Sequence, residues 1–118
     1  MSFKKKSPRE IVEYCFGRAI EYHRQGLVDS AVSYLCDIVK LVCDVNVSKA
    51  LLYGNCANTQ YICEDNDKYR EIVVWNPLTR AKLIVSIERI EKDGKEVINV
   101  YVEYSDKVNS VVHRKYFE

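Results

Sequence analysis

The dipeptide Asp93-Gly94 lies between two long segments in which apolar and polar residues alternate. These segments span residues 80–92 and 95–104. An Asp-Gly pair in this setting is a strong signal for a two-residue β-hairpin, because both central residues of the favoured turn need a left-handed backbone. The chain is therefore expected to contain at least one long antiparallel strand pair.

The register of this hairpin follows from pairing the two residues that flank the turn, Lys92 and Lys95. Three pairs of apolar side chains then fall on one face: Leu83 with Tyr104, Val85 with Val102, and Ile87 with Val100. The other face is mixed and polar, with Ile84, Ser86, Glu88, Asn99, Tyr101 and Glu103. One face buried and one face solvated is typical of an antiparallel sheet.

Two further segments extend the predicted sheet. Residues 69–75 alternate and are stopped by Asn76-Pro77, and a last strand is expected from about residue 108 to 117. We therefore predict an antiparallel β-meander of three to four strands, whose last strand is ordered within the sheet or pairs across a dimer.

The first half of the chain has helical periodicity. Ser7-Pro8-Arg9-Glu10 combines a serine N-cap, a proline at the first helical position and a glutamate that can complete a capping box. Apolar residues recur at helical spacing up to Gly26 and again over residues 28–44, and a third helix is expected from Ser48 through Cys63. The predicted fold is α+β, with a three-helix layer packed on the apolar face of the meander.

One domain is expected to occupy residues 1–118, because 13.8 kDa is enough to bury a core. Within it we expect a basic N-terminal tail at 1–6, a helical part at 7–64 and a β part at 69–117. We find no repeat and no low-complexity segment in the sequence.

Four cysteines are mirror-placed: Cys43 follows Cys36 by seven positions, and Cys63 follows Cys56 by seven. If two antiparallel helices carry them, Cys43 faces Cys56 and Cys36 faces Cys63. Three interpretations remain open: two rung disulfides, close-packed free thiols, or a shared metal. The metal is disfavoured, because cysteines two turns apart on a helix lie about 10 Å apart. We expect no metal and no cofactor.

The setting of the protein is expected to be cytoplasmic, or the host cytoplasm if the chain is viral. No apolar run approaches the roughly 20 residues of a membrane span, and the basic start leads into an amphipathic stretch. Abundant Val, Ile, Tyr, Lys and Glu with only two Gln indicate a thermophilic, archaeal or viral source. Disulfides inside cells are most common in such organisms.

One weak catalytic pattern is present. Arg18 and His23 are five positions apart, a spacing that resembles the R-x4-6-H motif of HEPN-type helical ribonucleases. In that family the resemblance implies acid-base chemistry by His23 and phosphate stabilisation by Arg18. The resemblance covers these two residues and their helical environment only.

A nucleic-acid surface is the second functional hypothesis. Its candidate residues are basic or aromatic: Lys4, Lys5, Lys6, Arg80, Lys82, Arg89 and Tyr101. A net charge of +1 and the many carboxylates between these positions favour a solvated, ion-paired surface instead.

The leading hypothesis is a non-enzymatic protein-interaction domain that self-associates or docks on a larger complex. The segment from Ala19 to Ile38 resembles one helical hairpin of a tetratricopeptide or MIT-like module. Nine tyrosines and one tryptophan supply side chains that are favoured at protein interfaces. No complete catalytic motif can be assembled from the sequence.

Overall fold

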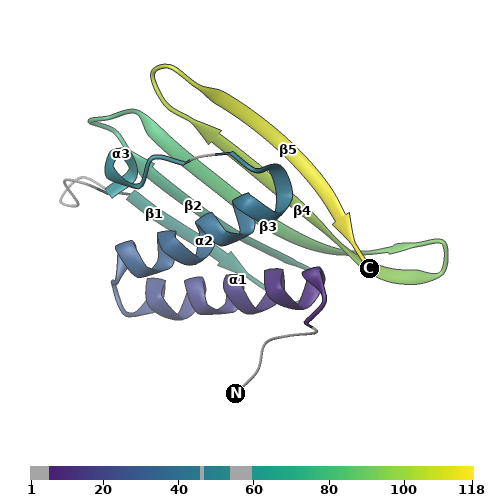
Figure 1. Cartoon of the computed structure of the whole chain (residues 1–118). Coiled ribbons are helices and arrows are strands. Elements are labelled where there is room, and N and C mark those ends of the chain that lie inside the picture. The colour runs from purple at the N-terminus through teal and green to yellow at the C-terminus, as the bar shows by residue number, and fades with distance from the viewer. Residues whose placement is uncertain (1–5, 46, 54–59) are drawn as a thin grey trace.

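The structure is a computed structural model that describes residues 6–45, 47–53 and 60–118. It contains a helical half followed by a sheet (Figure 1). The elements, in chain order, are α1 (Pro8–Arg24), α2 (Val28–Cys43), α3 (Lys49–Tyr53), β1 (Gln60–Asp65), β2 (Tyr69–Asn76), β3 (Ala81–Lys92), β4 (Lys95–Ser105) and β5 (Ser110–Phe117). The predicted α+β class, with N-terminal helices and a C-terminal antiparallel meander, is confirmed.

Helix α1 begins as the sequence predicts. The Ser7 hydroxyl oxygen accepts from the backbone N–H of Glu10 at 3.2 Å, and the Glu10 carboxylate accepts from the Ser7 N–H at 2.8 Å. This reciprocal pair is a capping box with proline at the first turn. The helix ends at Arg24, and Gly26, with a φ of 76°, reverses the chain into α2.

The sheet is a meander in which spatial order equals sequence order, β1 to β5, and all neighbours are antiparallel. The predicted hairpin register is confirmed, with Lys92 opposite Lys95 and Val85 opposite Val102. Asp93 and Gly94 have φ values of 54° and 78°, the left-handed pair that the turn requires. The last predicted strand is ordered within the sheet, as β5 beside β4.

The third helix is much shorter than predicted, and this changes the account of the cysteines. Helix α3 ends at Tyr53, and Cys63 lies in strand β1 opposite Ile72. The predicted helix pair through Cys63 is therefore wrong, whereas the Cys43–Cys56 pair is not described because Cys56 lies outside the described residues. Cys36 and Cys43 carry free thiols. Residues 60–64 of the predicted helical part thus belong to strand β1.

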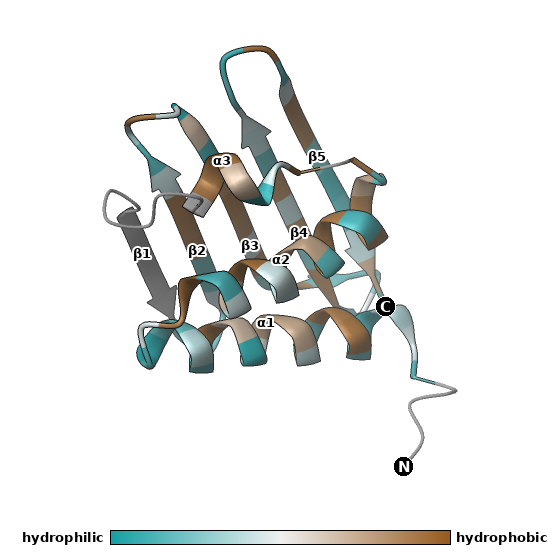
Figure 2. Cartoon of the chain, turned by 60° about the vertical axis from the view of Figure 1, so that its left-hand side comes forward, coloured by the Kyte–Doolittle hydropathy of each residue, from teal (hydrophilic) through white to brown (hydrophobic). Residues whose placement is uncertain are grey.

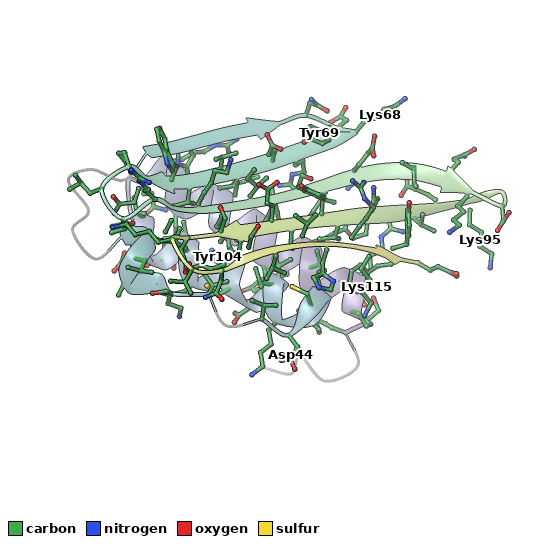
Figure 3. All side chains as sticks on the ribbon, turned by 90° about the horizontal axis from the view of Figure 1, so that it is seen from above. Asp44, Lys68, Tyr69, Lys95, Tyr104 and Lys115 are labelled. Atoms are coloured by element: carbon green, nitrogen blue, oxygen red, sulfur yellow. The ribbon has the colours of Figure 1, made fainter. Side chains whose placement is uncertain are left out.

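The helices cover one face of the sheet and leave the other face open (Figures 2 and 3). The shared core consists of apolar side chains from both layers: Val12, Cys15, Phe16, Ala19, Ile20, Val32, Leu35, Ile38, Val39, Leu52, Ile72, Val74, Ala81, Leu83, Val85, Ile87, Ile98, Val100, Val102, Tyr104 and Phe117. Burial of this set supplies the main favourable term in folding.

The tip of the β3–β4 hairpin projects past the helices (Figure 1). Charged side chains on the two strands next to this tip hold the hairpin to the start of α1. Arg9 donates to the Glu96 carboxylate at 2.7 Å and to the Glu96 carbonyl at 2.9 Å, and Arg89 lies 3.4 Å from Glu13. These contacts fix how the first helix sits on the sheet.

Candidate functional site

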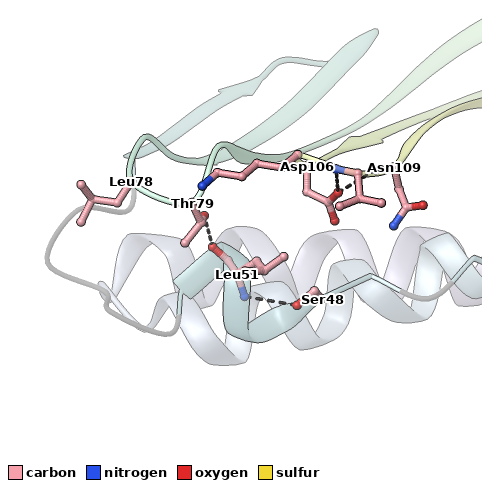
Figure 4. Close-up of a pocket in the computed structure, with 8 residues that line it drawn as sticks. Ser48, Leu51, Leu78, Thr79, Asp106 and Asn109 are labelled. Atoms are coloured by element: carbon pink, nitrogen blue, oxygen red, sulfur yellow. Dashed lines mark hydrogen bonds between the residues drawn. The ribbon is translucent and has the colours of Figure 1, made fainter.

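A hollow of about 620 Å³ opens at one end of the sheet (Figure 4). Three segments that are distant in sequence form it: the start of α3, the β2–β3 turn and the β4–β5 turn. We call it the end hollow, and it is lined by Ser48, Leu51, Leu78, Thr79, Asp106, Lys107, Val108 and Asn109.

The β4–β5 turn is held by Asp106. Its carboxylate accepts from the backbone N–H groups of Val108 at 2.8 Å and Asn109 at 2.7 Å, and from the Tyr104 hydroxyl at 2.7 Å. The hydrogen bond from Tyr104 is the largest reason why the pKa of Asp106 is lowered. Burial raises the pKa of Tyr104 to about 12. The Asp106 carboxylate and the buried Tyr104 side chain thus hold the β4–β5 turn in one conformation.

The β2–β3 turn is fixed in a similar way. The Asn76 side-chain oxygen accepts from the N–H of Leu78 at 3.0 Å, and the Asn76 amide donates to the Leu52 carbonyl at 3.4 Å. The Thr79 hydroxyl donates to the Leu51 carbonyl at 2.5 Å, which ties this turn to α3. Two rigid turns and a short helix therefore frame the end hollow.

The apolar side chains around the end hollow are exposed. Leu51 is 36% exposed, Leu78 63% and Val108 87%. Polar side chains at these positions would lower the free energy of unfolding only slightly, because the present side chains bury little surface in the fold. Aliphatic groups gathered around one concavity are typical of a surface that meets another molecule.

A second concavity, of about 320 Å³, lies on the open face of the sheet. Its floor is Ser86 in β3 and Asn99 in β4, each only 6% exposed, and larger side chains surround them. We call it the cradle, and it is lined by Tyr69, Glu71, Ser86, Glu88, Asn99, Tyr101 and Arg114. Small residues in the central strands between long residues in their neighbours create the depression.

Hydrogen bonds and a cation–π contact hold the side chains that form the walls of the cradle. Tyr69 donates to the Glu71 carboxylate at 2.8 Å, and Tyr101 donates to Glu103 at 2.6 Å. The latter bond is the main cause of the raised pKa of Tyr101. The Arg114 guanidinium lies 5.1 Å from the centre of the Tyr101 ring.

The floor of the cradle contains an unsatisfied group. The Oδ1 atom of Asn99 is buried and accepts no hydrogen bond within the described part of the protein. Leaving a buried acceptor unpaired costs about 1–3 kcal/mol. The atom has almost no solvent-accessible surface, so a molecule placed in the cradle does not reach it in this conformation.

Arg18 and His23, the predicted catalytic pair, have different surroundings. Arg18 donates to the Tyr22 hydroxyl at 3.0 Å and to Glu21 at 3.1 Å, and its guanidinium lies 5.9 Å from the Tyr34 ring centre. Hydrogen bonds to Tyr34 and Tyr22 raise the pKa of Arg18, whereas burial lowers the pKa of His23. Arg18 thus links helix α1 to helix α2 through the side chains of Tyr22 and Tyr34.

The predicted nucleic-acid residues are dispersed. Lys82 lies 3.9 Å from Glu103 on the open face, where Tyr101 also bonds Glu103. Arg89 points to Glu13 on the helical side, and Arg80 occupies the exposed β2–β3 turn. Of the basic tail, Lys4 and Lys5 lie outside the described residues, and the Lys6 ammonium is 5.6 Å from the centre of the Tyr14 ring.

Within residues 6–45, 47–53 and 60–118, no three His, Cys, Asp or Glu side chains are grouped so that they could hold a metal ion. No helix in the described portion of the chain is both long and apolar enough for a membrane span.

The alternating pattern of the hairpin predicted part of the cradle, and no sequence feature predicted the end hollow. The predicted polar face of the hairpin contains Ser86, Glu88, Asn99 and Tyr101. The end hollow combines three connections, whose proximity only the fold reveals. The chain matches no protein-family model, and no curated protein or solved structure shows significant similarity to it.

Proposed function

We propose that this chain is a small non-enzymatic protein-interaction domain that docks a partner polypeptide at the end hollow. The observation that supports the proposal is the exposure of Leu51, Leu78 and Val108 around one concavity framed by rigid turns. An aliphatic or aromatic side chain of the partner would be removed from water among these three residues.

The polar rim suits the same role. Ser48, Lys107 and Asn109 surround the apolar side chains and supply groups that can bond a partner backbone. Because the turns are held by Asp106 and Asn76, little ordering is needed on binding, which favours affinity. The partner is a larger complex or a second copy of the chain.

The proposal retains a cytoplasmic location. A partner in the same compartment is then expected.

The test compares two exposed valines. Val108 lies at the end hollow and is 87% exposed, whereas Val112 lies on the open sheet face and is 58% exposed. Val108→Asp and Val112→Asp introduce the same charge, and Val108→Asp should leave the melting temperature nearly unchanged because exposed substitutions rarely matter. Quantitative affinity purification from the native host, with light scattering of the purified protein, measures hetero- and self-association.

A partner, or a dimer, that is lost with Val108→Asp and retained with Val112→Asp would support the proposal. A protein that associates equally with both variants, or no association at all, would rule out the end hollow as the docking site.

A further inference from the structure

We propose that strand β5 is a second interaction site, which accepts an extended, acidic segment of another protein as an additional antiparallel strand. The order of the sheet places β5 at one edge, with β4 as its neighbour (Figure 1). No residue of β5 lines the end hollow, so this inference goes beyond the proposed docking function.

The first argument is the direction of the backbone groups of β5. In an antiparallel pair, residues that exchange hydrogen bonds with the neighbouring strand alternate with residues that do not. The Asp106 N–H donates to the Asn109 carbonyl at 2.9 Å, so the odd-numbered residues of β5 bond β4. Val112, Arg114 and Tyr116 then direct their N–H and C=O groups away from the sheet. No described residue bonds these groups, which are therefore open to a further strand.

The second argument is the regularity of this edge. The 8 residues of β5 pair with β4 in one continuous register, and the strand contains no proline. Bulges and prolines are common means of preventing an edge strand from pairing, and both are missing here. Val112 and Tyr116 are 58% and 46% exposed, although they lie on the same face of an ordered strand. A strand added beside β5 would cover part of both side chains while it gains main-chain hydrogen bonds.

The third argument is charge, which identifies the partner. Arg114 and Lys115 are exposed, and neither forms an ion pair with a described residue. Their cationic groups lie only over aromatic rings, 5.1 Å from the centre of Tyr101 and 5.4 Å from the centre of Phe117. The strand has no aspartate or glutamate, so a second copy of β5 would bring the same cations to the edge. Like charges on adjacent strands are destabilising and opposite charges are favourable, so the edge favours an acidic partner over self-pairing.

The alternation of side chains defines the pattern that such a partner needs. Val112, Arg114 and Tyr116 share the open face, and Lys115 lies on the face toward the helices. A residue opposite Arg114 should therefore be acidic, and the residues two positions to either side, opposite Val112 and Tyr116, should be aliphatic. A further acidic residue next to the central one would lie opposite Lys115.

The probe is a heptapeptide with blocked ends and the sequence Thr-Val-Glu-Glu-Glu-Val-Thr, and its control has lysine in place of the three glutamates. Chemical-shift titration of the ¹⁵N-labelled protein gives the dissociation constant. We expect the acidic peptide to bind and to shift the amide signals of β5 most, and the basic peptide not to bind. N-methylation of the central glutamate removes a donor that faces β5 and should abolish binding. N-methylation of an adjacent glutamate, whose N–H points away from β5, should leave binding nearly unchanged.

Two lysines at opposite edges of the sheet provide a matched control (Figure 3). Lys115→Gln and Lys68→Gln remove the same charge from exposed positions. We expect Lys115→Gln to weaken binding of the acidic peptide by about threefold and Lys68→Gln to leave it unchanged. Val112→Pro removes an N–H that points away from β4, so it should abolish binding while the domain stays folded. If Val112→Pro lowers the melting temperature, the N-methylated peptides and the two lysine variants still decide the question.

Several results would overturn the proposal. Equal weakening by Lys115→Gln and Lys68→Gln would show diffuse attraction of anions, and equal binding of the two N-methylated peptides would show that no strand is added. Binding of neither peptide, or equal binding of the basic peptide, would exclude an acidic partner. A dimer in light scattering that is lost with Val112→Pro would show that a second copy occupies the edge. Val108→Asp should leave peptide binding unchanged, so the two proposals fail separately.

Discussion

The covered and open faces of the sheet can be told apart by one pair of substitutions, Val102→Ala and Val112→Ala. Val102 lies in β4 with no exposed surface beneath the helices, and Val112 lies in β5 on the open face with 58% exposure. Both changes remove the same two carbons, from the central strand β4 at Val102 and from the edge strand β5 at Val112. The difference between them measures burial under the helices.

The magnitude follows from the structure. Removing two buried carbons costs about 1.6 kcal/mol of transfer free energy, and the cavity left behind raises the loss for Val102→Ala to about 2–3 kcal/mol. For Val112, which is more than half exposed, the loss is about 0.7 kcal/mol. In a chain of 118 residues, 2–3 kcal/mol lowers the melting temperature by about 8–12 °C.

Urea denaturation followed by circular dichroism gives both free energies of unfolding, and the slope of each curve shows whether the unfolding remains two-state. Equal losses for the two variants, or a larger loss for Val112→Ala, would refute the assignment of a covered and an open face. The cradle would then lose its structural basis as well.

Three further predictions follow from the charges and thiols. Because the pKa of Asp106 is lowered in the fold, its contribution is present above the ordinary carboxyl pKa and is lost as the pH falls through the folded value; Asp106→Asn should flatten the acid limb of a stability-against-pH curve. Burial raises the pKa of the Cys15 thiol to about 11, so mass spectrometry should find this thiol unalkylated in the native protein at neutral pH and alkylated in denaturant. Since Lys82 and Arg89 each face a carboxylate, we expect no mobility shift with single-stranded RNA at physiological salt; a salt-dependent shift would instead favour nucleic-acid binding.

Local signals predicted the fold where they agreed with tertiary packing. The Asp93-Gly94 turn set the register of eleven paired positions between β3 and β4, and the Ser7 capping box set the start of α1. The strand Gln60–Asp65 was missed because Leu52, Cys56 and Cys63 recur at helical spacing. Pairing with β2 outweighed that periodicity, since the backbone of residues 60–65 gains partners there.

The candidate sites were less predictable, for a physical reason. Alternation along β3 and β4 reveals which side chains share a face, so Ser86 and Asn99 could be placed together. The alternation does not predict the depth of the cradle, because that depth depends on Tyr69 and Arg114 in the flanking strands. Turns that converge from separate parts of the chain, as at Val108, have no periodic signature at all.

The sequential order of the strands also bears on how quickly this chain finds its structure. Every strand pairs with the next in sequence, and α1 packs beside α2, so each of these steps closes a short loop. Hairpins and helices of this kind form on the microsecond scale, roughly 0.1–10 μs. The bond from Arg9 to Glu96 spans 87 positions, and docking the helical pair on the meander is the step with the largest loop to close. Stopped-flow refolding should therefore be limited by that docking, with α1 and β4 coming together at the barrier.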